Sequence, residues 1–207
     1  MITLMKKIAA ALAMECRSRG LYFTLIMYWG HGIGAARGLF YKAVYFRNIK
    51  ATVYLLQANS RIEVFSKRAK VYIGKFVYIR KNASLRIDLS GELHLGDKVF
   101  INDNCNINCV SKITIGEYTK IAPNVSINDH DHNYKSSGSD HLLKGEVLIG
   151  KHVWIGSNVV ILRDTVIGDH AVIAAGSVVK GVVPPGTLFL NKREKQFIHY
   201  ETASAAQ

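Results

Sequence analysis

Two aspartate–histidine pairs follow one another in the stretch INDHDHNYKS, which covers residues 127–136. The pairs are Asp129–His130 and Asp131–His132. Imidazole has an unperturbed pKa of about 6.5, so it can take or give a proton near neutral pH, and it also binds metals. A neighbouring carboxylate can orient the ring. The stretch therefore suits a catalytic base or a metal site, and a polar loop without chemistry is the third interpretation.

The sequence around this stretch has a regular hydrophobic pattern with a period of six. In IGKHVWIGSNVVILRDTVIGDHAVIAAGSVV, residues 149–179, an isoleucine or valine returns at every sixth position. This period is neither the 3.6 of a helix nor the 2 of a single strand. It predicts a mainly β solenoid with three short faces and about 18 residues per coil, in which the aliphatic residues point inward. Glycine, asparagine and aspartate are expected at the corners.

The repeat is interrupted in three places. Two of them are two-residue slips, in which consecutive aliphatic positions lie two residues apart instead of six: Leu93 and Leu95, and Ile113 and Ile115. The third interruption is long and polar, DHDHNYKSSGSDHLLKGE, residues 129–146. It predicts a loop that protrudes from the solenoid, with both histidines at its root. Loops on rigid scaffolds often carry function.

The chain divides into three segments by composition. Residues 1–55 are expected to be a helical cap, residues 56–185 the solenoid, and residues 186–207 a basic C-terminal segment. Within the cap, LYFTLIMYWGHGIGAA, residues 21–36, has no charged side chain but is slightly short for a membrane span. Basic residues flank it, so the cap is also a candidate for peripheral contact with an anionic lipid surface. The two roles are compatible.

Composition limits the classes of partner. The 207 residues are 49% hydrophobic and 20% charged, as in a folded globular chain. A formal net charge of +12 favours nucleic acid, a lipid surface or a phosphate-bearing small molecule. No nucleic-acid-binding motif is recognisable, so nucleic acid is not expected. The three cysteines, Cys16, Cys105 and Cys109, lack CxxC spacing, which disfavours a disulfide scaffold or a cysteine-rich zinc site and fits the cytoplasm.

The hexads IGEYTKIAPNVSI and IGKHVWIGSNVVILRDTVIGDHAVIAAGSVV resemble those of the hexapeptide-repeat acyltransferases. The resemblance covers about residues 60–197 and is greatest to the sugar O-acetyltransferases. In that family a histidine opens the protruding loop and a tryptophan follows in a VWIG hexad; here these are His130 and Trp154. The resemblance implies a left-handed parallel β-helix, acetyl-CoA as acyl donor, and a homotrimer with active sites between its subunits.

The resemblance also implies roles for individual residues. His130 is expected to be the general base, oriented by Asp129 or Asp131, with His132 as the competing candidate. The candidate acceptor contacts are Asn106, Asn108, Tyr134 and Trp154. The candidate coenzyme contacts are Trp154, Gly156, Ser157, Ala174, Ala175, Lys180 and Lys195. The C-terminal stretch LNKREKQF departs from the GxPAK-like segment of the family, so the phosphate-binding residues are the least defined.

The expected function is direct transfer of acetyl from acetyl-CoA to a sugar hydroxyl in cell-surface polysaccharide synthesis. Neither Cys105 nor Cys109 lies in the loop, so no covalent acyl-enzyme is expected. Alternative acceptors are an amino sugar, a serine or an antibiotic. A zinc enzyme like the γ-class carbonic anhydrases, built from His130, His132, His141, His152 and His170, is a second alternative, although no metal is expected. A non-enzymatic scaffold is the third.

Overall fold

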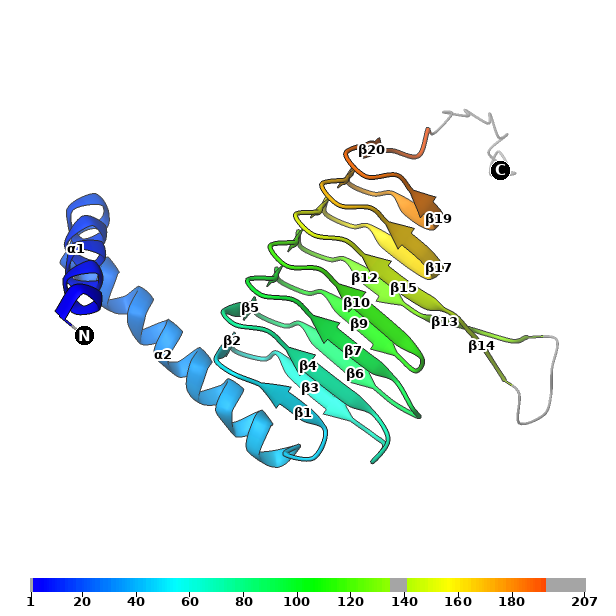
Figure 1. Ribbon diagram of the computed structural model, residues 1–207, viewed down its shortest axis with the longest axis horizontal. Coiled ribbons are helices and arrows are strands. Elements are labelled where there is room, and N and C mark those ends of the chain that lie inside the picture. Colours follow the sequence, from blue (N-terminus) through cyan, green and yellow to red (C-terminus); the bar gives the residue numbers. More distant parts are fainter. Residues whose placement is uncertain (1, 135–140, 193–207) are drawn as a thin grey trace, which may run out of the picture.

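The computed structural model describes residues 2–134 and 141–192, which form two helices followed by a parallel β-solenoid (Figure 1). The helices are α1 (Ile2–Arg19) and α2 (Leu21–Val44). The strands stack in register from coil to coil, in the arrangement of a left-handed β-helix. This confirms the predicted fold.

Each coil contributes a strand to three faces. The first face stacks β1 (Ile49–Ala51), β4 (Lys70–Ile73), β7 (Glu92–Leu95), β10 (Lys112–Ile115) and β15 (Glu146–Ile149). The second stacks β2 (Tyr54–Leu56), β5 (Val77–Ile79), β8 (Phe100–Ile101), β11 (Lys120–Ile121), β16 (Trp154–Ile155), β18 (Val172–Ile173) and β20 (Leu188–Phe189). The third stacks β3 (Arg61–Val64), β6 (Ser84–Ile87), β9 (Asn106–Cys109) and β12 (Ser126–Asn128). The longer strands β17 (Val160–Ile167) and β19 (Val178–Val183) bend from the third face into the first.

The core is the predicted ladder of aliphatic side chains. On the second face, Ile79, Ile101, Ile121, Ile155 and Ile173 are stacked and buried. The two-residue slips have a simple explanation. In the four-residue strands β7 and β10, side chains two positions apart point to the same side, so Leu93 and Leu95, like Ile113 and Ile115, all face the core.

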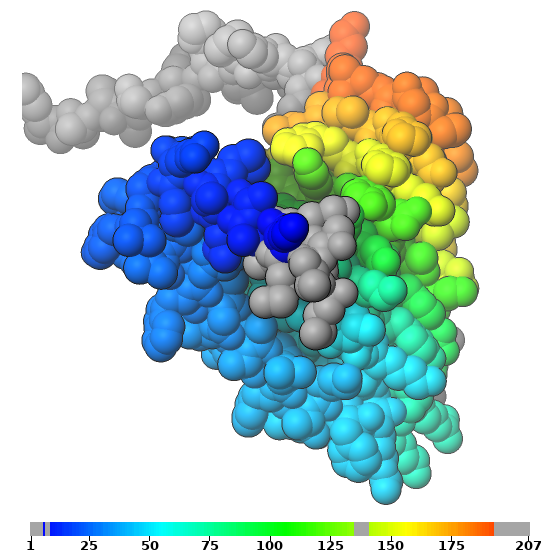
Figure 2. Space-filling model, turned by 60° about the vertical axis from the view of Figure 1, so that its left-hand side comes forward, coloured from blue at the N-terminus to red at the C-terminus, as the bar shows by residue number. Residues whose placement is uncertain are grey.

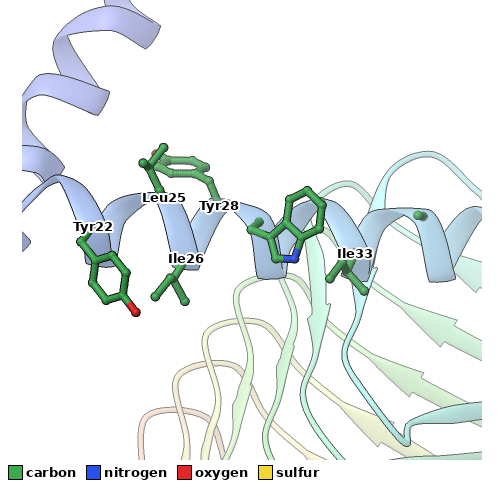
Figure 3. Close-up of a pocket in the computed structure, with 8 residues that line it drawn as sticks. Tyr22, Leu25, Ile26, Tyr28 and Ile33 are labelled. Carbon is green, nitrogen blue, oxygen red and sulfur yellow. The ribbon is translucent and has the colours of Figure 1, made fainter.

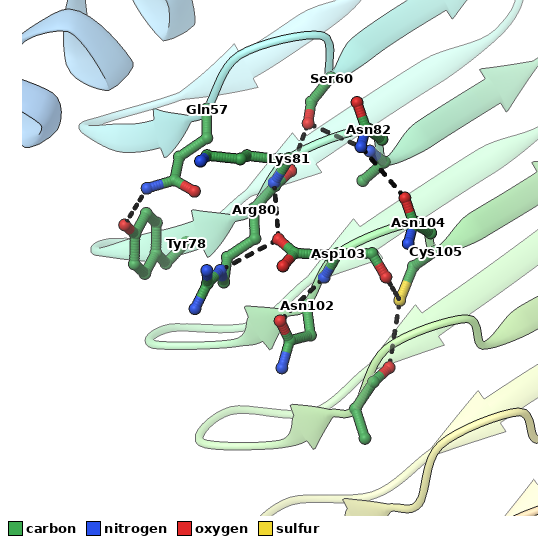
Figure 4. A network of polar contacts seen from close by, with 12 residues as sticks. Gln57, Ser60, Tyr78, Arg80, Lys81, Asn82, Asn102, Asp103, Asn104 and Cys105 are labelled. Carbon is green, nitrogen blue, oxygen red and sulfur yellow. Dashed lines mark hydrogen bonds and ion pairs between the residues drawn. The ribbon is translucent and has the colours of Figure 1, made fainter.

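The corner between the second and third faces, here called the asparagine corner, contains Asn59, Asn82, Asn104, Asn124 and Asn158. All five have positive φ, which asparagine tolerates better than most residues. The side chains of three of them form a ladder: Asn82 Nδ2 donates to Asn104 Oδ1 (3.1 Å) and Asn104 Nδ2 to Asn124 Oδ1 (3.2 Å), as Figure 4 shows for the first pair. This corner uses the expected residue type.

The corner between the first and second faces, here called the stacked corner, differs from expectation. Its positive-φ positions hold Phe76, Lys98, Tyr118, His152 and His170. The rings of Tyr118 and His152 stack with centroids 4.9 Å apart, and His152 and His170 do the same. Lys98 Nζ lies 4.8 Å from the centroid of Tyr118. Contacts between successive coils thus offset the cost of left-handed backbone in residues larger than glycine or asparagine.

The second half of α2 covers the open end of the solenoid. Gly34 and Gly38 lie against Leu56 and Tyr54, and the Tyr54 hydroxyl donates to the Gly38 carbonyl (2.8 Å). Arg37 Nη2 donates to the Ser60 carbonyl (2.8 Å). A β-carbon at Gly38 would lie 2.7 Å from the Tyr54 carbonyl oxygen, so the close approach requires glycine. The first strand already begins at Ile49, within the stretch assigned to the N-terminal segment.

Candidate functional site

The polar insertion forms a hairpin at its base. The strands β13 (His130–His132) and β14 (Leu142–Lys144) pair antiparallel and project from the coils (Figure 1). Asp131 accepts a hydrogen bond from Arg163 Nε at 2.8 Å, which ties β13 to β17. Asp131 is therefore paired with Arg163. Of the two carboxylates expected to orient His130, Asp129 is the one that contacts its ring.

Asp129 is fully buried and held by backbone donors. Its carboxylate accepts from the amide N–H of Val110 (3.0 Å) and of Ser111 (2.8 Å) in the coil below. Its Oδ1 lies 2.9 Å from Nδ1 of His130, whose side chain is 18% exposed. Buried carboxylates need such partners, and here they fix the oxygen that faces the ring.

This contact sets the chemistry available to His130. An ionised carboxylate only accepts hydrogen bonds, so Nδ1 must carry the proton. The neutral ring then keeps the lone pair on Nε2, the nitrogen that a base would use. His132 is the exposed end of β13 and pairs with Leu142 across the hairpin.

A cavity of about 190 Å³ lies next to His130. Its other lining residues are Phe65, Arg86, Asp88, Asn108, Cys109 and Val110. Of the two asparagines expected at the acceptor, Asn108 lines this cavity and donates to Asn128 Oδ1 (2.8 Å). Asn106 lies on the same strand, β9, but is not part of the lining. Tyr134, also an acceptor candidate, is 88% exposed beyond the end of β13.

Sequence analysis did not predict three of the lining residues, Phe65, Arg86 and Asp88, because they precede the loop by two or three coils. Only the register of β3, β6, β9 and β12 brings them to the same side as His130. Sequence analysis also did not predict the contact of Arg163 with Asp131, because it joins residues 32 positions apart in the sequence.

The coenzyme candidates form a separate group. Trp154 lies on the second face, 51% exposed, and Gly156, Ser157, Ala174 and Ala175 occupy the corner that follows it. Gly156 packs so closely on the next coil that a β-carbon would lie 2.6 Å from the Ala175 nitrogen. These five residues are thus brought together by the stacking of β16 on β18.

Within one chain this group does not meet His130. His130 follows β12 at the corner between the third and first faces, whereas Trp154 lies on the second face, opposite that corner. Lys180 is exposed on β19. Lys195 falls outside the described residues.

Both solenoid cysteines are buried. Burial raises the pKa of the Cys109 thiol, and the carboxylate of Asp129 raises it further. Burial also raises the pKa of Cys105. Both thiols are therefore protonated at neutral pH, which makes them poor nucleophiles.

In residues 2–134 and 141–192, no group of three or more histidine, cysteine, aspartate or glutamate side chains is arranged to hold a metal ion. Two histidines of the zinc alternative, His152 and His170, are stacked face to face at the stacked corner. His130 lies at a different corner, bound to Asp129.

Comparisons with known proteins agree with the solenoid fold. Residues 146–181 match the family described as bacterial transferase hexapeptide (six repeats). Galactoside O-acetyltransferase of Escherichia coli (strain K12) is 32% identical over 145 residues, covering 67% of this chain and 71% of that protein. A candidate lipopolysaccharide biosynthesis O-acetyl transferase, WbbJ, of the same strain is 37% identical over 117 residues, covering 50% of this chain and 60% of that protein.

A solved structure supports the same architecture. A mutant of AntD, an N-acyltransferase from Bacillus cereus in complex with dTDP and coenzyme A, superposes with a TM-score of 0.53 at 17% identity. The superposition covers 71% of this chain and 80% of that chain. With the sequence relatives, this likeness of fold leads to one conclusion: the chain belongs to the hexapeptide-repeat acetyltransferases.

Proposed function

We propose that the protein is an acetyl-CoA-dependent O-acetyltransferase that acts on a hydroxyl of a sugar, with His130 as general base. The observation that carries the proposal is the Asp129–His130 pair. A buried carboxylate, held by two backbone N–H groups, orients a half-buried imidazole beside a cavity. The two Escherichia coli relatives, one named for a galactoside and one for lipopolysaccharide, support a sugar acceptor.

The chemistry follows from the orientation of the ring. Nε2 of His130 takes the proton of the acceptor hydroxyl as its oxygen attacks the thioester carbonyl carbon. A backbone N–H steadies the oxyanion of the tetrahedral intermediate. The C–S bond then breaks, and coenzyme A leaves as a thiolate that recovers the proton from His130. Transfer is direct, because the raised pKa values of Cys105 and Cys109 disfavour a thiolate nucleophile.

The coenzyme site proposed here is the end of the second face. Trp154 forms a wall, and the small residues Gly156, Ser157, Ala174 and Ala175 let the pantetheine arm lie close to the backbone. Lys180 and Lys195 are the proposed phosphate contacts. Because Trp154 lies on the face opposite the His130 corner, we propose that a second copy of the chain, in a homotrimer, brings the two together.

The two N-terminal helices support a proposal about where in the cell the reaction takes place. The first half of α2 has exposed apolar side chains on several sides, and Trp29 is 74% exposed. In Figure 3, Tyr22, Ile26 and Ile33 point to one side of the helix and Leu25 and Tyr28 to another, around a groove of about 860 Å³. A helix that is apolar all round belongs in an apolar surrounding. No helix among the described residues is long and apolar enough to span a membrane.

We therefore propose that α1 and the first half of α2, which stand beside the coils as a lobe (Figure 2), lie in the surface of the cytoplasmic membrane. Arg17 and Arg19 in the last turn of α1 would meet anionic headgroups. Sedimentation with phosphatidylglycerol vesicles tests this. Trp29→Asp is expected to lower the bound fraction about threefold or more, and Phe76→Asp, on the solenoid, to leave it unchanged. Equal binding of both variants contradicts the assignment.

Coenzyme A release from acetyl-CoA tests the reaction itself, with a panel of sugars, nucleotide sugars and glycan fragments. Release that requires both a sugar and His130 supports the proposal. Release with His130→Ala equal to that of wild type removes His130 from the role of base. Release with an amino sugar, serine or antibiotic but with no sugar hydroxyl contradicts the acceptor class and leaves acetyl transfer intact.

A further inference from the structure

The residues that line the cavity beside His130 come from four successive coils. Its lining runs from His130 through Val110 and Asp88 to Phe65, along the corner between the third and first faces. The amide of Phe65 bonds to the Ile87 carbonyl (3.0 Å) and that of Asp88 to the Cys109 carbonyl (3.0 Å), so these residues stack at the same corner. Three strand spacings of about 4.8 Å separate β3 from β12, about 14 Å in all. A single pyranose ring is shorter than this.

Phe65 closes the far end of the cavity and is 61% exposed, although the solenoid offers a buried core for aromatic side chains. An exposed aromatic face packs well against the C–H side of a sugar ring, which removes apolar surface of both from water. Such a face is useful in a site that also has polar groups for the hydroxyls. The residues between Phe65 and His130 supply those groups.

Arg86, Asp88 and Asn108 line the middle of the cavity. Arg86 Nε donates to Glu63 Oε2 (3.0 Å), and Glu63 is also 3.6 Å from Arg61 Nε. This pairing holds the guanidinium, and the carboxylate of Asp88 in the same lining opposes its charge, so the site suits a neutral, hydroxyl-rich ligand better than an anion. Asp88 is half-buried, and its Oδ1 accepts from the Leu89 amide (2.6 Å). The middle of the cavity therefore has both fixed donors and fixed acceptors.

We infer that Phe65 is a specificity-determining residue: it forms a subsite for a second sugar ring of the acceptor, so the enzyme selects an oligosaccharide over a monosaccharide. The reacting sugar lies at His130, the linkage passes Asn108 and Asp88, and the next ring packs on Phe65. This inference rests on the proposed function, since it assumes that the acceptor is a sugar. It adds the prediction that the preferred acceptor has at least two sugar rings, and it names Phe65 as the residue that contacts the second ring.

The test compares kcat/KM for a monosaccharide acceptor and for an oligosaccharide that ends in the same sugar. Phe65→Ala is expected to lower kcat/KM for the oligosaccharide about tenfold, as for the loss of one aromatic contact, and to lower the monosaccharide value much less. Phe65→Trp, which keeps an aromatic face, should retain the preference. Phe76→Ala is the matched control, because Phe76 is 67% exposed at the stacked corner and does not line the cavity.

The outcomes separate this inference from the proposed function. Equal kcat/KM for the two acceptors in wild type, or equal losses for both in Phe65→Ala, overturns the subsite while sugar acetylation stands. If no sugar supports coenzyme A release, both proposals fail. The melting temperature of Phe65→Ala should match that of Phe76→Ala within a few degrees, because both side chains are exposed.

Discussion

Histidines occupy two corners of the same solenoid in opposite surroundings. At one corner His130 is half-buried, bonded to the buried Asp129 and next to a cavity. At the stacked corner, His152 and His170 are exposed, have positive φ and lie face to face. The residue type is the same, and the difference lies in what each ring touches. A carboxylate partner holds one ring nitrogen of His130 beside the cavity, whereas a ring partner uses the imidazole as a flat surface for packing.

The largest expected effect is the loss of the base. His130→Ala should lower kcat by a factor on the order of 10²–10⁴, because the acceptor hydroxyl then loses its proton without a positioned base. His152→Ala should change kcat less than about twofold, since His152 is at the stacked corner. Steady-state coenzyme A release measures both, and similar losses in the two variants would refute the distinction between the corners.

The carboxylate is expected to matter next. In Asp129→Asn one oxygen is replaced by an NH₂ group, which cannot accept from the Val110 and Ser111 amides or from Nδ1 of His130. The side chain must leave either a backbone donor or the ring without its acceptor. A fall in kcat on the order of 10², the lower end of the contribution of a general base, is expected because His130 remains but its ring is no longer oriented.

The KM for acetyl-CoA separates positioning from general damage in this variant. It should stay within about twofold of wild type if Asp129 acts only through His130. A fall in kcat that is accompanied by a large rise in this KM would mean that the solenoid itself has been disturbed.

The two corners also differ in completeness. The stacked corner is formed within one chain, whereas the His130 corner lacks the tryptophan proposed to face it. Mixing His130→Ala and Trp154→Ala chains tests this. In a trimer with each site shared by two neighbours, one subunit pair in four has both wild-type residues, so unfolding and refolding an equal mixture should restore about a quarter of wild-type activity. No restoration would place both residues in the same chain's site.

The fold was predictable because every coil of the solenoid repeats the same pattern of inward-facing and corner residues. The period of six specifies which side chains face inward, and Ile149 to Val179 keep it without interruption. The site was predictable only in part. His130 and Asp129 are adjacent in sequence, so their pairing needs no knowledge of register. Arg163, Arg86 and Phe65 approach the hairpin or cavity only through stacked coils, and one sequence contains no signal for that.

The stacked corner shows the opposite limit. Sequence patterns predict glycine or asparagine where φ is positive, and asparagine does occupy that position at the asparagine corner. Tyr118, His152 and His170 break the rule because their stacking depends on identical backbone geometry in successive coils. The conformational cost of a positive φ arises within one residue, whereas the stacking that offsets this cost depends on residues in neighbouring coils.

The smallest effect on activity, and a clear one on stability, is expected at this corner. His152 stacks on Tyr118 below and His170 above, so His152→Ala removes two ring contacts and keeps a β-carbon at φ 55°. The free energy of unfolding should fall by about 1–2 kcal/mol, as for the loss of one or two aromatic pairs. His170→Ala removes only one of these stacks and should cost about half as much. Denaturant unfolding of the three proteins at one pH measures the series. Equal losses for the two variants would mean that the backbone conformation, and not the stack, determines the contribution of these histidines.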